Sequence, residues 1–380
     1  MELILKQYDI PLLRFSATND SSTPEIEVHW INEDQRHLLP LDMELSPEGI
    51  SRWMRRRTIP RNRAYVNRLL AKCGLNANRP MGILALCKGL SVDDSYWVVE
   101  EGFEGTFEKY NLFENRFSEV LALIAFTGYG SSNRSSLASS PEFTTNGMLP
   151  KCWRRISGKV TLYKGGTDGG YNTGAEPYCE YYAAQVAAAM GIDAIPYGLS
   201  QWKGRLCSTC ELFTDIDHAY MPIGNLVQRG GFDAVAAYYE NLGEPFQKAF
   251  RDMLVFDAVI CNTDRHYGNF GFMIDNKTNT IAAPAPLFDH GNSLFNQARP
   301  EDYESAEALQ QYIDTLVPCV YDDFFVTAKR FMTDENREQL RKLLGFRFKR
   351  HVRYNLPPKR LKLMEEQVRK RAMRLLENKE

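Results

Sequence analysis

Residues 262–269 read Asn-Thr-Asp-Arg-His-Tyr-Gly-Asn, and residues 286–292 read Pro-Leu-Phe-Asp-His-Gly-Asn. Between them, the stretch from 270 to 289 carries a turn-like Asp-Asn-Lys-Thr-Asn flanked by two short apolar runs, which predicts a β-hairpin. We expect Asp289 to end the second strand of this hairpin. A hairpin returns the chain to the end where it began, so the 262–269 loop and Asp289 should lie close together.

Asp264, Asn269 and Asp289 would then bring two carboxylates and one amide to the same place. Phosphoryl transfer needs such a set, because a carboxylate orients the attacking hydroxyl and oxygen ligands hold Mg²⁺. The sequence therefore predicts Asp264 as the hydroxyl-orienting group, with Asn269 and Asp289 as magnesium ligands. Turn residues are the alternative explanation for all three, since Asp and Asn also favour ordinary loops.

Upstream, Lys164 ends a predicted strand at 160–164, and Glu180 lies in a predicted helix at 177–190 that Gly191 terminates. A lysine on a strand, paired with a carboxylate from a neighbouring helix, is the arrangement that binds phosphates in kinases. Glu176 competes with Glu180 for the pairing role. An exposed lysine at a strand end and solvated glutamates at a helix start remain the alternatives. A flexible loop at 144–151 precedes the strand, where backbone N–H groups could cradle phosphate oxygens.

These motifs together resemble the HipA-like serine/threonine kinases, relatives of the phosphatidylinositol-kinase fold that occur in bacterial toxin–antitoxin modules. The resemblance covers about residues 130–330 and rests chiefly on the N-x-D-x-H-x-x-N pattern at 262–269. It implies that Asp264 is the catalytic aspartate, and that Asn269 and Asp289 bind magnesium. It also implies that Lys164 is the ATP lysine and Glu180 its partner.

The same resemblance implies further ATP contacts and a regulatory phosphorylation. Gly147 to Lys151 is similar to the flexible phosphate loop of the family, although this stretch holds only one glycine. Residues 210–213, including Glu211 and Phe213, would be the hinge that meets adenine through its backbone. The family autophosphorylates a serine in or beside the phosphate loop. Within 131–145 the candidate equivalents are Ser139, Ser140, Thr144 and Thr145.

The expected fold is α+β: a two-lobed protein-kinase-like core with an N-terminal accessory region and a mainly helical C-terminal lobe. We expect residues 1–126 to be the accessory region, 127–215 the N-lobe and 216–380 the C-lobe. Residues 1–126 do not match the usual N-terminal domain of the family. Within them we expect a helix that starts at Ser46-Pro47, a helix at 62–73, and an amphipathic helix over 113–124.

The segment from Arg52 to Lys72 contains eight basic residues and no acidic one. A solvated face, a DNA-contacting surface and a docking surface for an acidic partner all fit this pattern. The formal net charge of the whole chain is -2, which argues against a surface built throughout for nucleic acid. The eight basic residues are Arg52, Arg55, Arg56, Arg57, Arg61, Arg63, Arg68 and Lys72.

We expect a cytoplasmic protein without a membrane contact. No run of 18 apolar residues is present, and the N-terminus does not have the pattern of a signal peptide. Eight scattered cysteines fit reduced thiols better than disulfides, and the single CxxC at Cys207–Cys210 does not predict a zinc site. We expect His266 to hold the catalytic loop together and His290 to pack beside Asp289.

The sequence therefore predicts an ATP- and Mg²⁺-dependent serine/threonine protein kinase that autophosphorylates in the 131–145 loop. Its expected partners are a protein substrate with a serine or threonine acceptor and, as a candidate, a cognate antitoxin or regulator. Nucleic acid would be reached only through such a partner or through the Arg52–Lys72 segment. The alternatives are a kinase of the same fold acting on a lipid or small molecule, and an inactive kinase-fold regulator that binds DNA or protein.

Overall fold

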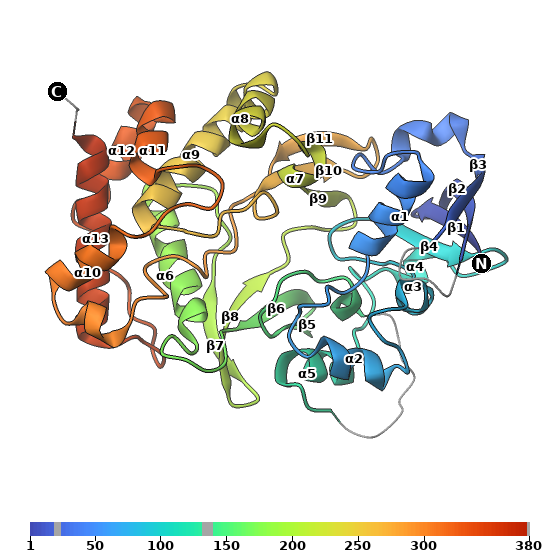
Figure 1. Ribbon diagram of the computed structural model, residues 1–380, viewed down its shortest axis with the longest axis horizontal. Helices are drawn as coiled ribbons and strands as arrows, with labels where there is room; N and C mark the ends of the chain where they lie inside the picture. Colours follow the sequence, from blue (N-terminus) through green and yellow to red (C-terminus); the bar gives the residue numbers. More distant parts are fainter. Residues whose placement is uncertain (19–23, 131–139, 378–380) are drawn as a thin grey trace. The chain divides into compact units, whose positions relative to one another are not determined.

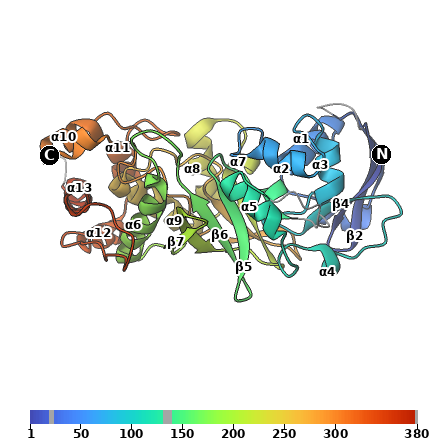
Figure 2. The same ribbon diagram turned by 90° about the horizontal axis from the view of Figure 1, so that it is seen from below.

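The computed structural model describes residues 1–18, 24–130 and 140–377. Helices and several β-sheets alternate along the chain, which confirms the predicted mixed architecture. The chain packs into two compact units (Figures 1 and 2). The first comprises Met1–Lys164, Glu211–Met221 and Met273–Ala282; the second comprises Gly165–Cys210, Pro222–Phe272 and Ala283–Glu380. The functional division at 126 and 215 stays a prediction.

An antiparallel four-stranded sheet, which the sequence reasoning missed, opens the first unit. Its strand order is β3-β2-β1-β4, and alternate side chains such as Leu3, Leu5 and Phe15 are buried on one face. Helices α1 and α3 contribute Trp53 and Leu84 to the same core. The bounds are β1 Glu2–Gln7, β2 Ile10–Ala17, β3 Ile26–Ile31, β4 Tyr96–Glu100, η1 Glu33–Leu38, α1 Pro47–Arg56 and α3 Pro80–Cys87.

The rest of the first unit supports the candidate phosphate loop. Strands β5 and β6 form an antiparallel pair in register from Lys151 opposite Lys164 to Ile156 opposite Lys159. Helices α2 and α5 lie against each other, and α5 packs against β5 (Figure 1). The bounds are α2 Val66–Lys72, α4 Phe107–Tyr110, α5 Glu119–Thr127, η2 Pro141–Phe143, β5 Lys151–Ile156 and β6 Lys159–Gly165. A three-stranded sheet of order β11-β10-β9 follows later in the chain, with bounds β9 His218–Pro222, β10 Gly271–Asp275 and β11 Thr280–Pro284.

The second unit is mainly helical and is built around α9. The C-terminal half of this helix, from Met253 to Ile260, is buried on every side, and α6, α11 and α13 pack against it (Figure 1). The bounds are α6 Ala175–Met190, β7 Gly198–Trp202, β8 Arg205–Glu211, α7 Ile223–Leu226, α8 Gly231–Asn241, α9 Glu244–Ile260, η3 Pro300–Tyr303, α10 Ala306–Ile313, α11 Phe324–Phe331, α12 Asp334–Arg341 and α13 Pro358–Leu376. None of the helices in the described part of the chain is long and apolar enough to cross a membrane.

Several predicted elements are confirmed, including the Ser46 cap of α1, the Gly191 end of α6 and the hairpin β10–β11. The amphipathic helix predicted over 113–124 begins only at Glu119, because the Ser118 side chain accepts from the backbone N–H of Leu121 and caps the helix there. Asp289 does not end the second hairpin strand, which stops at Pro284. Prolines cannot donate to a ladder, and Pro284 and Pro286 end the strand early.

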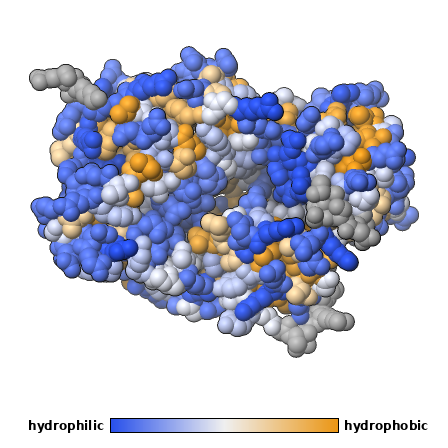
Figure 3. All heavy atoms as spheres, viewed as in Figure 1, coloured by the Kyte–Doolittle hydropathy of each residue, from blue (hydrophilic) through white to orange (hydrophobic). Residues whose placement is uncertain are grey.

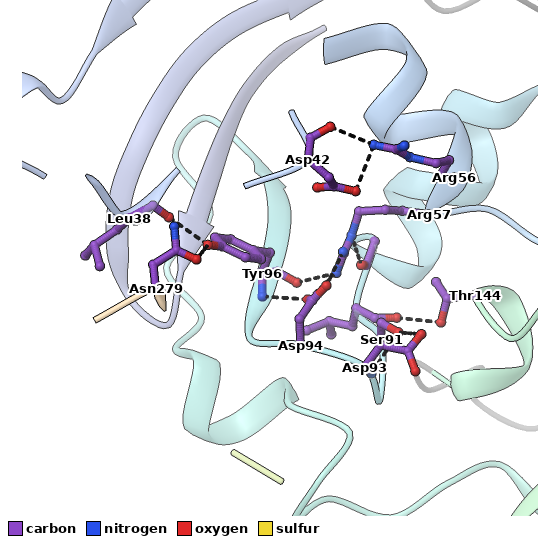
Figure 4. Close-up of polar contacts among 12 residues, drawn as sticks. Leu38, Asp42, Arg56, Arg57, Ser91, Asp93, Asp94, Tyr96, Thr144 and Asn279 are labelled. Carbon is purple, nitrogen blue, oxygen red and sulfur yellow. Dashed lines mark hydrogen bonds and ion pairs between the residues drawn. The ribbon is translucent and has the colours of Figure 1, made fainter. Parts of the chain in front are cut away.

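The prediction of a basic surface from Arg52 to Lys72 is wrong for two of its members, which are internal. The guanidinium of Arg57 donates to both carboxylate oxygens of Asp94 at 2.7 and 2.8 Å and to the carbonyl of Gly89 (Figure 4). The side chain of Arg63 is 0% exposed. Arg52, Arg55, Arg61 and Arg68 are exposed. In Figure 3 the visible face is mostly hydrophilic, with apolar residues in small groups.

Asp93 lies in the same polar network as Arg57 and Asp94 (Figure 4). Its carboxylate accepts a hydrogen bond of 2.9 Å from the Ser91 hydroxyl. Burial, together with the neighbouring charge of Asp94, raises the pKa of Asp93 to about 6 from an ordinary value of 3.8. The folded chain therefore keeps a proton on Asp93 through a pH interval in which the unfolded chain has lost it.

We predict that Asp93→Asn stabilises the protein at neutral pH only. Since the pKa is raised on folding, Asp93 lowers stability as the pH rises from about 4 to about 6, by about 2–3 kcal/mol in total. Urea unfolding should give a higher free energy of unfolding for the variant at pH 7.5 and no gain at pH 4. The exposed Asp34→Asn change is the control. An equal gain at both pH values would contradict the assignment.

Candidate active site

The 262–269 loop leaves the C-terminus of α9 through a sharp turn. Cys261 adopts a left-handed conformation with φ of 55°, and its N–H donates to the carbonyl of Asp257, as does the N–H of Asn262. The loop then folds on itself: the N–H of His266 donates to the Asp264 carbonyl at 2.8 Å, and the N–H of Asn269 donates to the His266 carbonyl at 2.9 Å. These turns fix the backbone from which Asp264 and Asn269 project.

A buried ion pair anchors the loop to the helix. The guanidinium of Arg265 donates through Nε and Nη2 to the two carboxylate oxygens of Asp257, at 2.9 and 3.0 Å. Both side chains are almost fully buried, with 1% and 0% exposure. Burial works against the charged guanidinium, but Asp257 outweighs burial and raises the pKa of Arg265 above its ordinary value. Arg265 therefore remains a cation at the centre of the loop.

The remaining donors of Arg265 reach the two segments that the sequence predicts to converge. Its Nη1 donates to the Asn269 carbonyl at 3.2 Å and to the Phe288 carbonyl at 2.5 Å, and its Nη2 lies 3.0 Å from Nδ1 of His290. One guanidinium thus binds the residues before and after Asp289, and also the end of the 262–269 loop. The convergence predicted from the hairpin is confirmed.

Asn269 and Asp264 are oriented by hydrogen bonds of their own. The side-chain Nδ2 of Asn269 donates to the Asp264 carbonyl at 3.2 Å, which turns its oxygen Oδ1 the other way. The Asp264 carboxylate accepts at Oδ2 from Nδ2 of Asn292 at 2.8 Å. Among the described residues, none donates a hydrogen bond to the other Asp264 oxygen, Oδ1. A carboxylate held at one oxygen can accept from a ligand at the second.

Asn292 is a site residue with no role predicted from the sequence, although it ends the 286–292 stretch. Its Oδ1 accepts from Nδ2 of Asn296 at 2.9 Å, so that its own NH₂ group must face Asp264. Its backbone carbonyl accepts from the N–H and hydroxyl of Thr263. The only sequence signal was its place three residues after Asp289. Asn292 positions the Asp264 carboxylate.

The candidate partners of the ATP lysine, Glu176 and Glu180, both lie buried on α6. Glu180 accepts from the Ser208 hydroxyl, whereas Glu176 accepts from the hydroxyl and N–H of Thr167. A side chain at Gly291 would start 3.3 Å from Glu176 and 3.7 Å from Glu180, so α6 runs close beside the Asp289–Gly291 segment. The structure thus brings Glu180 to the same part of the second unit as Asp289.

A tyrosine holds the backbone of Asp289. The backbone N–H of Asp289 donates to the hydroxyl oxygen of Tyr197 at 3.0 Å, while Asp289 itself has a left-handed φ of 55°. Burial, with the charges of Glu180 and Asp289 nearby, raises the pKa of Tyr197 well above its ordinary value. Tyr197 is therefore a neutral hydroxyl that fixes the backbone of Asp289.

The two histidines support the loops, as the sequence analysis expects. His266 accepts at Nδ1 from the N–H of Gly268 at 3.0 Å. His290 is buried, and its ring packs edge-on against Tyr197 and Phe256. Because Arg265 can only donate, Nδ1 of His290 is the acceptor and its ring is neutral.

In the first unit, Lys151 and Lys164 face each other across the β5–β6 pair. Both lysines are 6% exposed. Gly147 has a φ of 90°, a left-handed conformation that favours glycine. The Nζ of Lys151 reaches back over the loop to the Asn146 carbonyl at 2.9 Å, where it lies against Gly147. The candidate phosphate loop thus folds over one of two closely placed cations.

Arg63 holds this loop, although the sequence reasoning treated it as part of a basic surface. Its guanidinium donates to the Glu142 carboxylate at 2.5 Å, to the carbonyl of Thr145 at 3.0 Å and to that of Lys151 at 2.9 Å. It therefore binds the chain on both sides of Gly147. A lone arginine in a basic run gives no sequence signal for such a role.

Three candidate autophosphorylation residues are engaged in hydrogen bonds. Ser140 is fully buried, and its hydroxyl oxygen accepts from the Glu142 N–H. The Thr144 hydroxyl donates to the Leu90 carbonyl at 2.9 Å, and the Thr145 hydroxyl accepts from the Trp153 indole at 3.0 Å. Ser139 lies outside the described residues, as do 131–138.

Of the predicted hinge, residues 211–213 belong to the first unit. The backbone N–H of Leu212 donates to the Val160 carbonyl at 2.9 Å, which ties this segment to β6. The Glu211 side chain is exposed and pairs with Lys159 at 2.7 Å, and the Phe213 ring contacts Tyr220. A role for Glu211 and Phe213 in binding adenine stays a prediction. Among the described residues, no group of three or more His, Cys, Asp or Glu side chains could hold a metal.

Comparison with solved structures places this geometry in a known fold. HipA of Shewanella oneidensis, solved in a complex with HipB and operator DNA, matches with a TM-score of 0.51 over 98% of this chain and 97% of its own, at 13% identity. This chain has a HipA-like kinase fold. No family model matches the sequence.

A sequence relative is a named protein kinase. The serine/threonine-protein kinase CtkA of Helicobacter pylori is 27% identical over 159 residues, which cover 38% of this chain and 48% of the relative. Its crystal structure covers 61% of this chain and 90% of its own, with a TM-score of 0.48 and 17% identity. The sequence match thus spans about half the length of the curated relative.

In this HipA-like fold the buried pair Asp257–Arg265 should dominate local stability. We predict that Arg265→Met lowers the free energy of unfolding by about 3–5 kcal/mol, because Asp257 is left as an unpaired buried charge. Denaturant unfolding measures the loss. The control Arg341→Met breaks an exposed pair with Glu338 and should cost less than about 1 kcal/mol. Equal losses in the two variants would contradict the anchoring role.

Proposed function

We propose that this chain transfers the γ-phosphate of ATP to a serine or threonine of a protein. The observation that carries the proposal is the set of bonds made by Arg265, which joins the Asp264–Asn269 loop to the segment that holds Asp289. The relation to a named serine/threonine-protein kinase supports it. Asp264, Asn269 and Asp289 are the residues that we assign to the reaction.

Asp264 orients and deprotonates the acceptor in this proposal. The hydroxyl donates to Oδ1 of Asp264 while Asn292 holds Oδ2. The hydroxyl oxygen forms a bond to the γ-phosphorus, the bond between that phosphorus and the β–γ bridging oxygen breaks, and the electron pair leaves with ADP. The hydroxyl proton passes to Asp264. A carboxylate fixed at one oxygen suits this task, because little rearrangement is needed on reaction.

Asn269 and Asp289 fit a magnesium site. The Nδ2 of Asn269 is held by the Asp264 carbonyl, which leaves the amide oxygen as the ligand atom, and the Asp289 backbone is fixed by Tyr197. Mg²⁺ prefers oxygen ligands and commonly takes only one or two side chains together with substrate phosphates. When bound, the ion would neutralise charge that develops on the phosphates.

Lys151 and Lys164 are the residues that we assign to the phosphates. The two lysines are opposite each other in the β5–β6 register, and like charges at such a position favour a shared anion. Gly147 keeps the loop close enough to Lys151 for backbone N–H groups to take part. Glu180 is the proposed partner of Lys164, with Glu176 as the alternative.

Autophosphorylation at Ser140, Thr144 or Thr145 would also be a conformational event. Their hydroxyl groups hold the loop in the described conformation, so a phosphate on any of them would break these contacts. Loss of these contacts would free the loop from its described conformation, which is how we propose that the loop inhibits the kinase. A HipB-like antitoxin or regulator is a candidate partner by analogy with the complex formed by HipA.

The principal alternative, an inactive regulator that binds DNA through the Arg52–Lys72 segment, has weaker support. Arg57 and Arg63 hold the interior of the first unit and are not available to phosphates of DNA. A kinase acting on a lipid or small molecule would use the same Asp264 chemistry.

We predict that the purified protein transfers label from γ-labelled ATP in the presence of Mg²⁺, either to itself or to added protein. Asp264→Ala and Asp289→Ala should reduce the transfer by a factor of about 100 or more, because each removes a group that acts at the phosphoryl centre. The exposed Asp334→Ala is the matched control. Equal transfer by all four proteins would exclude this site as the origin of the activity.

We further predict that Lys164→Met weakens ATP binding about 10- to 100-fold, since a hydrogen bond to a charged group contributes about 1.5–3 kcal/mol. Lys277→Met, at an exposed lysine in the β10–β11 turn, should change the affinity less than about twofold. Titration of a fluorescent ATP analogue against each protein gives the dissociation constants. Similar constants for the two variants would remove Lys164 from the phosphate site.

A further inference from the structure

A cavity of about 240 Å³ lies in the second unit, and two of the residues that line it, Thr263 and Asn292, adjoin Asp264. Its lining residues come from two parts of the chain. Thr263, Asn292 and Asn296 belong to the segments around the site, whereas Tyr312, Leu316 and Val317 belong to the end of α10 and the turn that follows. The second group lies outside the predicted kinase motifs. The cavity is large enough for one amino-acid side chain, since a water molecule takes about 30 Å³.

Two of the lining residues connect the cavity directly to the reacting carboxylate. Asn292 donates to Oδ2 of Asp264 at 2.8 Å, and Thr263 precedes Asp264 in the chain. A residue spans about 3.3–3.6 Å of extended chain. A peptide whose hydroxyl meets Asp264 would therefore bring a residue one or two positions away to this cavity.

The residues that line the cavity favour an apolar side chain over a charged one. All the described residues that line the cavity are uncharged, and Phe295, Leu316 and Val317 supply apolar surface. A charged side chain would find no ion partner among these lining residues, and any part of it that left water would lose hydration without compensation. An apolar side chain would gain burial instead. Val317 is 64% exposed, so the cavity is open to solvent on its side.

We propose that this cavity binds the side chain of an apolar residue one or two positions from the serine or threonine acceptor in a protein substrate. The inference rests on the proposed function and specifies the substrate class of the same site. It assigns Leu316 and Val317 to substrate selection, away from the residues that act on ATP.

The test compares phosphorylation of serine peptides that carry Leu, Lys or Asp at each of the two positions before and after the serine. The wild-type protein should prefer Leu over Lys at one of these positions by about tenfold or more. Val317→Asp should reverse this order toward Lys, because a carboxylate now lines the cavity. Val326→Asp is the matched control, since Val326 is 61% exposed on α11 but does not line the cavity.

The outcomes separate this inference from the proposed function. A reversal in Val317→Asp alone supports the inference. If Val317→Asp and Val326→Asp keep the wild-type order while Asp264→Ala abolishes transfer, the cavity inference is overturned and the kinase remains. Self-phosphorylation without transfer to any peptide also overturns the inference alone. If no protein or peptide receives phosphate, both fail.

Discussion

The buried pair between Asp257 and Arg265 is the interaction on which the candidate site depends. A charged guanidinium in the protein interior must satisfy all of its donors, and Arg265 does so with one carboxylate, two backbone carbonyls and an imidazole. These acceptors come from α9, from the 262–269 loop and from residues 288–290. Two segments without regular structure are thereby fixed to one buried helix, and the side chains that they carry are held in place.

In the first unit, a buried arginine fixes a loop in the same way. Arg63 donates to Glu142 and to carbonyls on both sides of Gly147, so that an irregular segment is fixed by a fully buried guanidinium. The planar fork of arginine suits this role, because it offers several donors in fixed directions. In each unit, loops that carry candidate ligand residues are thus bound to a rigid element by an arginine that itself touches no proposed substrate.

Sequence reasoning predicted the parts of the site that follow from chemistry at fixed spacing. Asp264, Asn269 and Asp289 were found because phosphoryl transfer needs those groups, and a hairpin explains why two of the segments meet. Asn292 and Arg63 were missed, because their roles arise from partners that are 28 and up to 88 positions away. The β1–β4 sheet was missed for the same reason: β4 joins β1 across about 90 residues, and no local pattern records that pairing. The error at Arg57 and Arg63 shows that a basic run in the sequence need not form a basic surface.

The proposed kinase activity requires the binding of Mg·ATP. Calorimetric titration of the purified protein measures this binding directly. We predict saturable binding of one ATP per chain, with an affinity that Mg²⁺ strengthens and that falls when EDTA removes the metal. Retained metal-dependent binding in Asn292→Ala would agree with its role in positioning Asp264 alone. Absence of any ATP binding, with and without Mg²⁺, would contradict the account and would favour a regulator that uses the fold without its chemistry.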